Sequence, residues 1–94
     1  MAYDRILRRM RECIRTHNYR MTEHAQDEAW KDDIAAEDIE NTINYGYIIE
    51  KQKDRETGEA KFVIRNILKY QQGVEVVAKI GFTGRLYILT VYLI

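Results

Sequence analysis

Residues 74–94, VEVVAKIGFTGRLYILTVYLI, decide the fold of this chain. Two runs rich in β-branched and aromatic residues, 74–82 and 86–94, predict two strands. The turn between them contains Gly84, which can adopt a positive φ, so the strands are expected to form a hairpin. The second run carries no charge and is apolar on both of its alternating faces. It is therefore expected to be an interior strand or to be covered by a partner.

Two further strands are predicted upstream, at about residues 47–53 and 60–67. The polar residues 54–59 form a hairpin loop between them, and residues 69–73 form a second loop that leads into the last hairpin. Consecutive strands joined by short loops pair as antiparallel neighbours. The expected sheet is a four-stranded antiparallel meander or close to one.

The first half of the chain predicts helices. Apolar residues between Tyr3 and Ile14 recur at spacings of three and four, which indicates an amphipathic helix over about residues 3–16. Cys13 lies in this apolar stripe, and that position favours a small buried residue over a nucleophile.

Two shorter helices are expected to follow. Asn18 and Tyr19 break the pattern of the first helix, and Thr22 is suited to be the N-cap of a helix over about residues 23–31. A third helix is predicted over about residues 35–44, and Gly46 stops it. The predicted class is α+β, with N-terminal helices packed on the antiparallel sheet.

Length and composition limit the kind of protein. A chain of 94 residues builds one hydrophobic core, so residues 1–94 are expected to form a single domain. One cysteine allows no internal disulfide and makes a reducing cytoplasm the default location. Six arginines in the first twenty residues interrupt any apolar stretch that could be an export signal or a membrane segment. We expect a cytoplasmic protein without membrane association.

Charge is unevenly distributed although the formal net charge is zero. Residues 1–20 are basic, residues 23–40 carry eight acids against Lys31 alone, and residues 65–85 are basic again. The two basic segments could converge and bind phosphate. Solvated faces that keep the domain soluble explain the same pattern.

The residue types argue against metal and nucleotide-cofactor chemistry and permit RNA cleavage without a metal. No histidine or cysteine spacing is typical of a metal site, and no glycine-rich loop opens a helix after a strand, so we expect neither a metal nor a nucleotide cofactor. RNA cleavage without a metal needs a base, an acid and cations that hold the phosphate. The candidates for proton transfer are His24, Tyr87 and Tyr92, and those for the phosphate are Lys61, Arg65, Lys79 and Arg85. Structural or solvated roles remain open for every one of them.

A resemblance to a known family is carried by short motifs spread over most of the chain. They are His24-Ala25, Glu28, Asp38, Gly46, Gln52 to Glu59, Lys61-Phe62 and Thr90-Val91-Tyr92. In this order and spacing they resemble the domain-of-unknown-function family numbered 4258. The resemblance implies a fold similar to that of the RelE-like ribonuclease toxins, which are toxin halves of toxin–antitoxin pairs and are sometimes encoded beside a small zinc-finger protein.

The same resemblance implies a catalytic site of His24, Glu28, Lys61, Thr90 and Tyr92. His24 and Glu28 would lie one helical turn apart, and Thr90 and Tyr92 on one side of their strand. The site requires His24, Lys61 and Tyr92 to share one solvent-reachable hollow. Each residue also has a structural alternative: His24 could brace the sheet, Tyr92 could be a core residue, and Lys61 could form a surface ion pair.

Two hypotheses about function follow from these residues. The first is a metal-independent mRNA endoribonuclease that is the toxin of a pair, with RNA, including ribosome-bound mRNA, as substrate and a zinc-finger type antitoxin as partner. The second is a non-catalytic member of the same fold that binds protein or RNA, and its uncharged last strand would also allow a homodimer. Many relatives have arginine where Glu28 stands, so this chain has a weaker cationic side, and its acidic run would repel phosphate.

Overall fold

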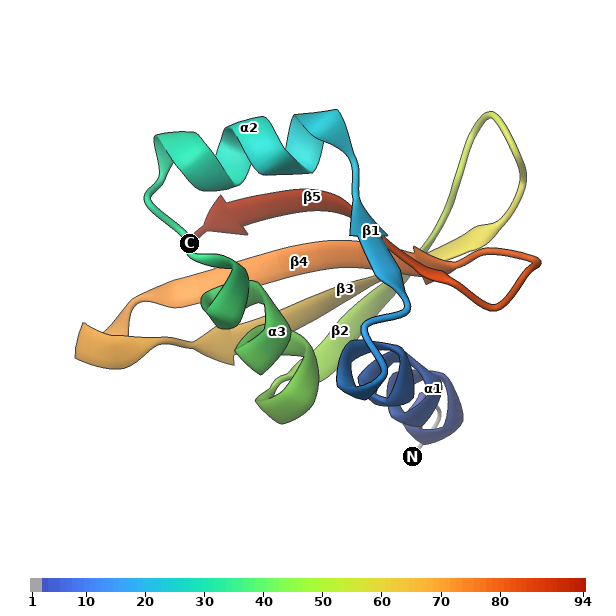
Figure 1. Ribbon diagram of the computed structural model, residues 1–94, viewed down its shortest axis with the longest axis horizontal. Coiled ribbons are helices and arrows are strands. Elements are labelled where there is room, and N and C mark those ends of the chain that lie inside the picture. The colour runs from blue at the N-terminus through green and yellow to red at the C-terminus, as the bar shows by residue number, and fades with distance from the viewer. Residues whose placement is uncertain (1–2) are drawn as a thin grey trace.

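The computed structural model describes residues 3–94, apart from the side chain of Lys69. Three α-helices, five strands and one short 3-10 helix follow one another along this part of the chain (Figure 1). Their bounds are α1 Asp4–Arg15, β1 Tyr19–Met21, α2 Glu23–Lys31, α3 Ala36–Tyr45, β2 Tyr47–Lys53, β3 Ala60–Ile67, η1 Lys69–Gln71, β4 Gly73–Ile80 and β5 Leu86–Leu93.

The sheet is five-stranded and mixed, which corrects the predicted four-stranded antiparallel sheet. Its order is β1-β5-β4-β3-β2, and every pair is antiparallel except β1 and β5, which are parallel. The extra strand is β1, where the sequence predicted only a break between helices. Tyr19 to Met21 pair with Leu86 to Ile88, so β5 lies between two strands, as its uncharged sequence predicted.

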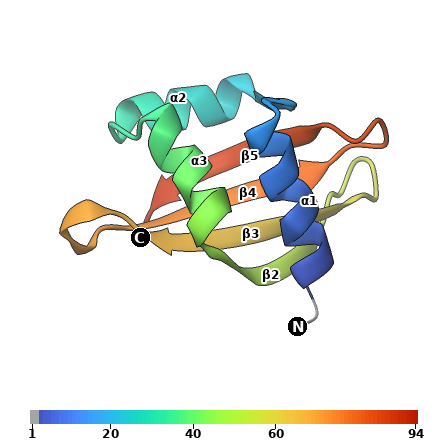
Figure 2. The same cartoon turned by 60° about the horizontal axis from the view of Figure 1, so that its bottom comes forward.

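One face of the sheet carries the hydrophobic core. Figure 2 shows α1 and α3 lying across this face, while α2 runs along the edge beside β5. The predicted stripe of α1 is confirmed, because Leu7, Met10, Cys13 and Ile14 are buried. The Cys13 thiol donates a hydrogen bond to the carbonyl oxygen of Gly84 at 3.3 Å, so this cysteine is a packed core residue.

The predicted ends of the shorter helices are confirmed, one of them for a different reason. The Thr22 hydroxyl accepts a hydrogen bond from the backbone N–H of Ala25 at 3.1 Å, which makes it the N-cap of α2. Gly46 ends α3 with a φ of −85°, so no left-handed conformation requires glycine there. A Cβ atom at this position would lie 2.4 Å from the carbonyl oxygens of Thr42 and Arg65, so close packing requires the glycine.

The opposite face of the sheet, which we call the open face, is uncovered by α1 and α3. Side chains alternate along a strand, so the neighbours of the core residues Phe62, Ile64 and Val76 point to the open face. Val63 and Val77 lie there and are buried outside the core cluster. The polar residues of this face are Glu50, Gln52, Lys61, Arg65, Glu75, Lys79, Tyr87, Thr90 and Tyr92.

No helix within residues 3–94 combines the length and the apolar character needed to cross a membrane.

Candidate functional site

A row of four side chains crosses one end of the open face. The strand register aligns Tyr92 of β5 with Glu75 of β4, Glu75 with Arg65 of β3, and Arg65 with Tyr47 of β2. The Tyr92 hydroxyl donates to Oε1 of Glu75 at 2.6 Å, and Nε of Arg65 donates to Oε2 of Glu75 at 2.7 Å. The carboxylate therefore binds both of its neighbours, and the row forms one hydrogen-bonded network.

This network sets the protonation states of its members. Burial alone would raise the pKa of Glu75, which is only 5% exposed, but hydrogen bonds from Tyr92 and Arg65 lower it overall. Burial, together with the hydrogen bond to Glu75, raises the pKa of Tyr92 to about 12. The Tyr92 phenol is therefore held protonated, and the Arg65 guanidinium is engaged by an internal carboxylate.

Lys79 of β4 is also engaged by acids of the protein. Its Nζ atom lies 2.9 Å from Oε1 of Glu59 and 3.6 Å from Oδ2 of Asp54, both in the loop between β2 and β3. The hydrogen bond to Glu59 raises the pKa of Lys79, and the same bond lowers the pKa of Glu59. Two of the four cations predicted to bind phosphate, Arg65 and Lys79, are thus paired with carboxylates inside the fold.

Lys61 of β3 differs from both, because it lines a hollow and makes no hydrogen bond or ion pair within the described part of the chain. The hollow has a volume of about 680 Å³. Its other lining residues are Gln52, Lys53, Asp54, Arg55, Glu56 and Leu89. Lys61 is four residues from Arg65 along the same strand, which is about 13 Å.

A second hollow, of about 390 Å³, adjoins the first at Leu89 and reaches the start of α2. Thr22 and Tyr87 line it together with Lys79. The ring of Tyr87 packs over Gly81, where a Cβ atom would lie 2.8 Å from the tyrosine Cε2 atom. The two hollows bring Lys61, Lys79 and Tyr87 to the same end of the open face.

His24 and Glu28 lie on α2, one turn apart as predicted. Nε2 of His24 is 3.2 Å from Oε1 of Glu28, and the histidine side chain is 68% exposed. The same oxygen of Glu28 accepts the backbone N–H of Val91 at 3.0 Å, and the Thr22 hydroxyl donates to the carbonyl oxygen of Leu89 at 3.2 Å. Thr22, the N-cap of α2, and Glu28 within α2 therefore cap the edge of β5 beyond the short strand β1, and Glu28 has a structural role whatever else it does.

The remaining predicted residues lie apart from one another. Thr90 is opposite Val77 on the open face, between the two ends of the sheet, and shares its side of β5 with Tyr92 as predicted. Arg85 lies in the turn before β5, where its Nε donates to Oδ1 of Asn18 at 3.3 Å. The helix α1 packs on the covered face, whereas Lys61, Arg65 and Lys79 lie on the open face. The two basic segments approach each other at the end of α1, where Cys13 and Asn18 contact Gly84 and Arg85.

The structure thus brings together only part of the predicted site. Lys61, Arg65, Lys79, Thr90 and Tyr92 share the open face, but Lys61 and Tyr92 belong to opposite ends of it. Neither His24 nor Tyr92 contributes to the hollow that Lys61 lines. The expectation that His24, Lys61 and Tyr92 meet in one hollow is not met, because the strand register separates Lys61 from the row of Tyr92.

Sequence reasoning missed the carboxylates that engage the predicted cations. Glu75 holds Arg65 and Tyr92, and Asp54 and Glu59 hold Lys79. Glu75 carried a signal, since it is the only charged residue among the apolar residues 74–78 of a predicted interior strand. A lone charge in such a position needs a partner on the neighbouring strands.

No group of three or more histidine, cysteine, aspartate or glutamate side chains in residues 3–94 is arranged to hold a metal ion.

Comparison with known proteins gives one match, to a family. No curated protein and no solved structure matches the chain. The sequence model of the family described as domain of unknown function DUF4258 matches residues 21–93, which is most of the chain and includes every candidate residue above. The chain belongs to the DUF4258 family.

Proposed function

We propose that this protein is a RelE-like ribonuclease toxin that cleaves mRNA without a metal ion. The observation that carries the proposal is the arrangement of His24, an exposed imidazole oriented by a carboxylate that is itself anchored on β5. This pair stands on the first turns of α2, close in sequence to Thr22, which lines a hollow of the open face. A general base with a carboxylate behind it is a recurring arrangement at sites of proton transfer.

The chemistry follows from the contact between His24 and Glu28. Nε2 of His24 faces Glu28 at 3.2 Å, and in this proposal Nδ1 accepts the proton of a ribose 2′-hydroxyl. The 2′-oxygen then attacks the adjacent phosphorus, and the bond from phosphorus to the 5′-oxygen breaks. The products are a 2′,3′-cyclic phosphate and a 5′-hydroxyl, and Lys61 stabilises the negative charge that grows on the phosphate.

Protonation of the leaving 5′-oxygen is assigned to Tyr87 in this proposal. Tyr87 lines the hollow beside the start of α2, whereas the Tyr92 proton is donated to Glu75. The pKa of Tyr92, raised to about 12, makes its phenol a poor acid. Tyr92 and Arg65 are therefore structural residues of the open face, and the proposed reacting groups are His24, Lys61 and Tyr87.

A second candidate is a non-catalytic member of the same fold that binds RNA or protein. The internal pairing of Arg65 with Glu75 and of Lys79 with Glu59 favours it, because these cations are not free to hold a phosphate. On the first proposal an antitoxin is the expected protein partner, and a small zinc-finger or DNA-binding protein encoded next to this chain would support the toxin assignment.

The test is induced expression in bacteria, followed by incubation of purified protein with mRNA in EDTA. Wild type is expected to stop growth and to leave 2′,3′-cyclic phosphate ends; His24→Ala is expected to abolish both effects, and Lys61→Ala to weaken both strongly. The matched control is His17→Asn, which changes the other histidine, exposed and at a φ of 57° that asparagine tolerates. A harmless wild type that leaves mRNA intact would replace the nuclease by the non-catalytic candidate.

A further inference from the structure

A second charged hollow lies on the other side of the sheet, where α1 meets β2 and β3. It has a volume of about 310 Å³ and is lined by Tyr3, Arg5, Ile6, Arg9, Lys51 and Phe62. Phe62 belongs to the core that α1 covers, so this hollow is on the covered face and is separate from the proposed reaction site. None of the roles assigned above uses it.

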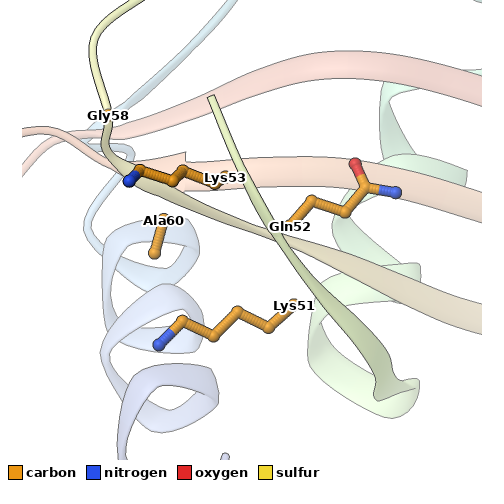
Figure 3. A pocket seen from close by; sticks show the side chains of 5 residues that line it. All are labelled: Lys51, Gln52, Lys53, Gly58 and Ala60. Atoms are coloured by element: carbon orange, nitrogen blue, oxygen red, sulfur yellow. The ribbon is translucent and has the colours of Figure 1, made fainter. Parts of the chain in front are cut away.

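The rim of the hollow is cationic. Arg5 and Arg9 are four residues apart on α1 and so lie on one side of that helix, and Lys51 faces them from β2. Lys51 also lines a neighbouring hollow of about 380 Å³ with Lys53. Figure 3 shows the side chains of Lys51 and Lys53 extending to one side of β2 and that of Gln52 extending to the other.

The four cations of these two hollows have no hydrogen-bonding or ion-pair partner in the described part of the chain. Among residues 3–94, Arg5, Arg9, Lys51 and Lys53 form no hydrogen bond and no ion pair. Unpaired cations side by side repel one another, and an anion that binds between them relieves this repulsion. The rim is therefore suited to a ligand that carries several negative charges.

The floor of the hollow is apolar and partly aromatic. The rings of Tyr3 and Phe62 meet edge to face, with centroids 5.7 Å apart and an interplanar angle of 68°, and Ile6 completes the floor. An aromatic floor inside a cationic rim is the combination by which proteins bind single-stranded nucleic acid, since bases pack on rings while phosphates meet lysine and arginine.

We propose that this hollow binds a single-stranded segment of RNA, with a base on Tyr3 and the flanking phosphates on Arg5, Arg9 and Lys51. The inference rests on the proposed RNA substrate but not on its cleavage. RNA held at this edge leaves the acidic helix α2 on the other side of the molecule (Figure 2), so the repulsion expected from the acids of α2 is weak here.

The test measures binding of a labelled twelve-nucleotide oligo(U) RNA by fluorescence anisotropy over a range of salt concentrations, with His24→Ala as the background so that the RNA is not cut. The double variant Arg9→Gln with Lys51→Gln is expected to weaken binding at least tenfold. It should also reduce the slope of log K against log salt by about 1.4, since each phosphate contact to a single strand contributes about 0.7. Tyr3→Leu is expected to weaken binding severalfold and leave this slope unchanged.

The matched control is Arg15→Gln, which removes a cation of the same helix that is already paired with Glu12. An equal loss for Arg15→Gln and for the double variant would overturn the inference, and so would the absence of any RNA binding. If the wild-type protein binds RNA through this hollow but cleaves none, the proposed nuclease activity is refuted and the proposed binding site is not. If the wild-type protein cleaves RNA but the double variant binds RNA as tightly as its His24→Ala background, the proposed binding site is refuted and the nuclease activity is not.

Discussion

The cations of the open face and the cations at the edge between α1 and β2 differ in their partners. Arg65 and Lys79 are bound by carboxylates of neighbouring strands and loops, whereas Arg9 and Lys51 form no ion pair in the described residues. The sequence alone did not separate the two groups, because it named phosphate ligands between residues 61 and 85 and also left phosphate binding open for the basic residues 1–20. The position of a basic residue in the sequence therefore says less about anion binding than the presence of an acid beside it.

The physical reason for the difference is burial. Glu75 lies in the middle of the sheet and is almost completely buried, so its carboxylate needs donors, and Tyr92 and Arg65 supply them. A phosphate that bound Arg65 would leave this carboxylate without its partner. At the edge between α1 and β2, none of the residues within 3–94 is a buried acid that competes for Arg9 or Lys51.

The comparison between paired and unpaired cations predicts its largest effect on stability for Glu75→Ala. The substitution leaves the Arg65 guanidinium and the Tyr92 hydroxyl without their common acceptor, and we expect it to lower the free energy of unfolding by about 3 kcal/mol. Urea unfolding measures the change. Glu56→Ala, in the exposed loop between β2 and β3, is the control and should stay within about 0.5 kcal/mol of wild type. Equal stabilities of the two variants would show that the network does not hold the sheet together.

A smaller effect is expected for the edge cap on α2. Glu28→Ala removes the acceptor of the Val91 backbone N–H, and Val91 is completely buried, so we expect a loss of about 1–2 kcal/mol. Glu28→Gln keeps an oxygen in place and should lose less than half as much. Hydrogen exchange of the Val91 amide is the sharper measurement, because it should accelerate in Glu28→Ala before the rest of the sheet is affected. An unchanged exchange rate of the Val91 amide would show that Glu28 does not stabilise the edge of β5, and its role would then be limited to the contact with His24.

The third prediction concerns pH. The folded-state pKa of Tyr92, about 12, lies above the ordinary value of 10.0, so its stabilising contribution is complete below pH 10.0 and disappears as the pH rises toward 12. Tyr92→Phe is expected to lose about 1 kcal/mol at pH 7. The difference from wild type should narrow between pH 10 and 12. Tyr19→Phe is the comparison arm, since burial and Glu40 raise the pKa of Tyr19 to about 12 as well.

The same unfolding experiment at acidic pH tests Glu75, whose contribution to stability is expected to be lost as the pH falls and not as it rises. Its pKa is lowered in the folded protein, so its contribution is complete above the ordinary value of 4.5 and is lost as the pH falls through the lowered one. Wild type should therefore lose stability in this range faster than Glu75→Ala. Parallel curves for the two proteins would contradict the pairing of Glu75 with Arg65.

Periodicity predicted the elements that bury a continuous apolar stripe. The helix stripe around Met10 and the uncharged run of β5 are long enough for their pattern to be read directly. Strand β1 could not be predicted in this way, because Tyr19 to Met21 is too short to show a period. Its pairing depends on β5 being available, which is a tertiary property.

For the candidate site, the alternation of side chains along a strand predicted the face of the sheet but not which residues are neighbours on it. Alternation placed Lys61, Thr90 and Tyr92 on one face of the sheet, as the sequence implied. Which of them are neighbours depends on strand register, and the irregularity between Val77 and Ala78, opposite residues 88–90, shifts it. Tyr92 is opposite Glu75, which is opposite Arg65, four residues along β3 from Lys61. A single sequence does not fix this register, so the separation of Lys61 from Tyr92 could be learned only from the structure.

The smallest change in stability is expected for Lys61→Ala, and this makes it the sharpest test of the comparison. Lys61 forms no ion pair with the residues that the structure describes, so its removal should change the free energy of unfolding by less than about 0.5 kcal/mol. If Lys61 holds the phosphate, RNA cleavage should nevertheless fall by about 100-fold, as for the loss of one group that stabilises a transition-state charge. Lys79→Ala is the matched variant, because it removes a cation of the same face that is already bound to Glu59. Equal losses of cleavage in the two variants would mean that pairing within the fold does not decide which lysine can act on RNA.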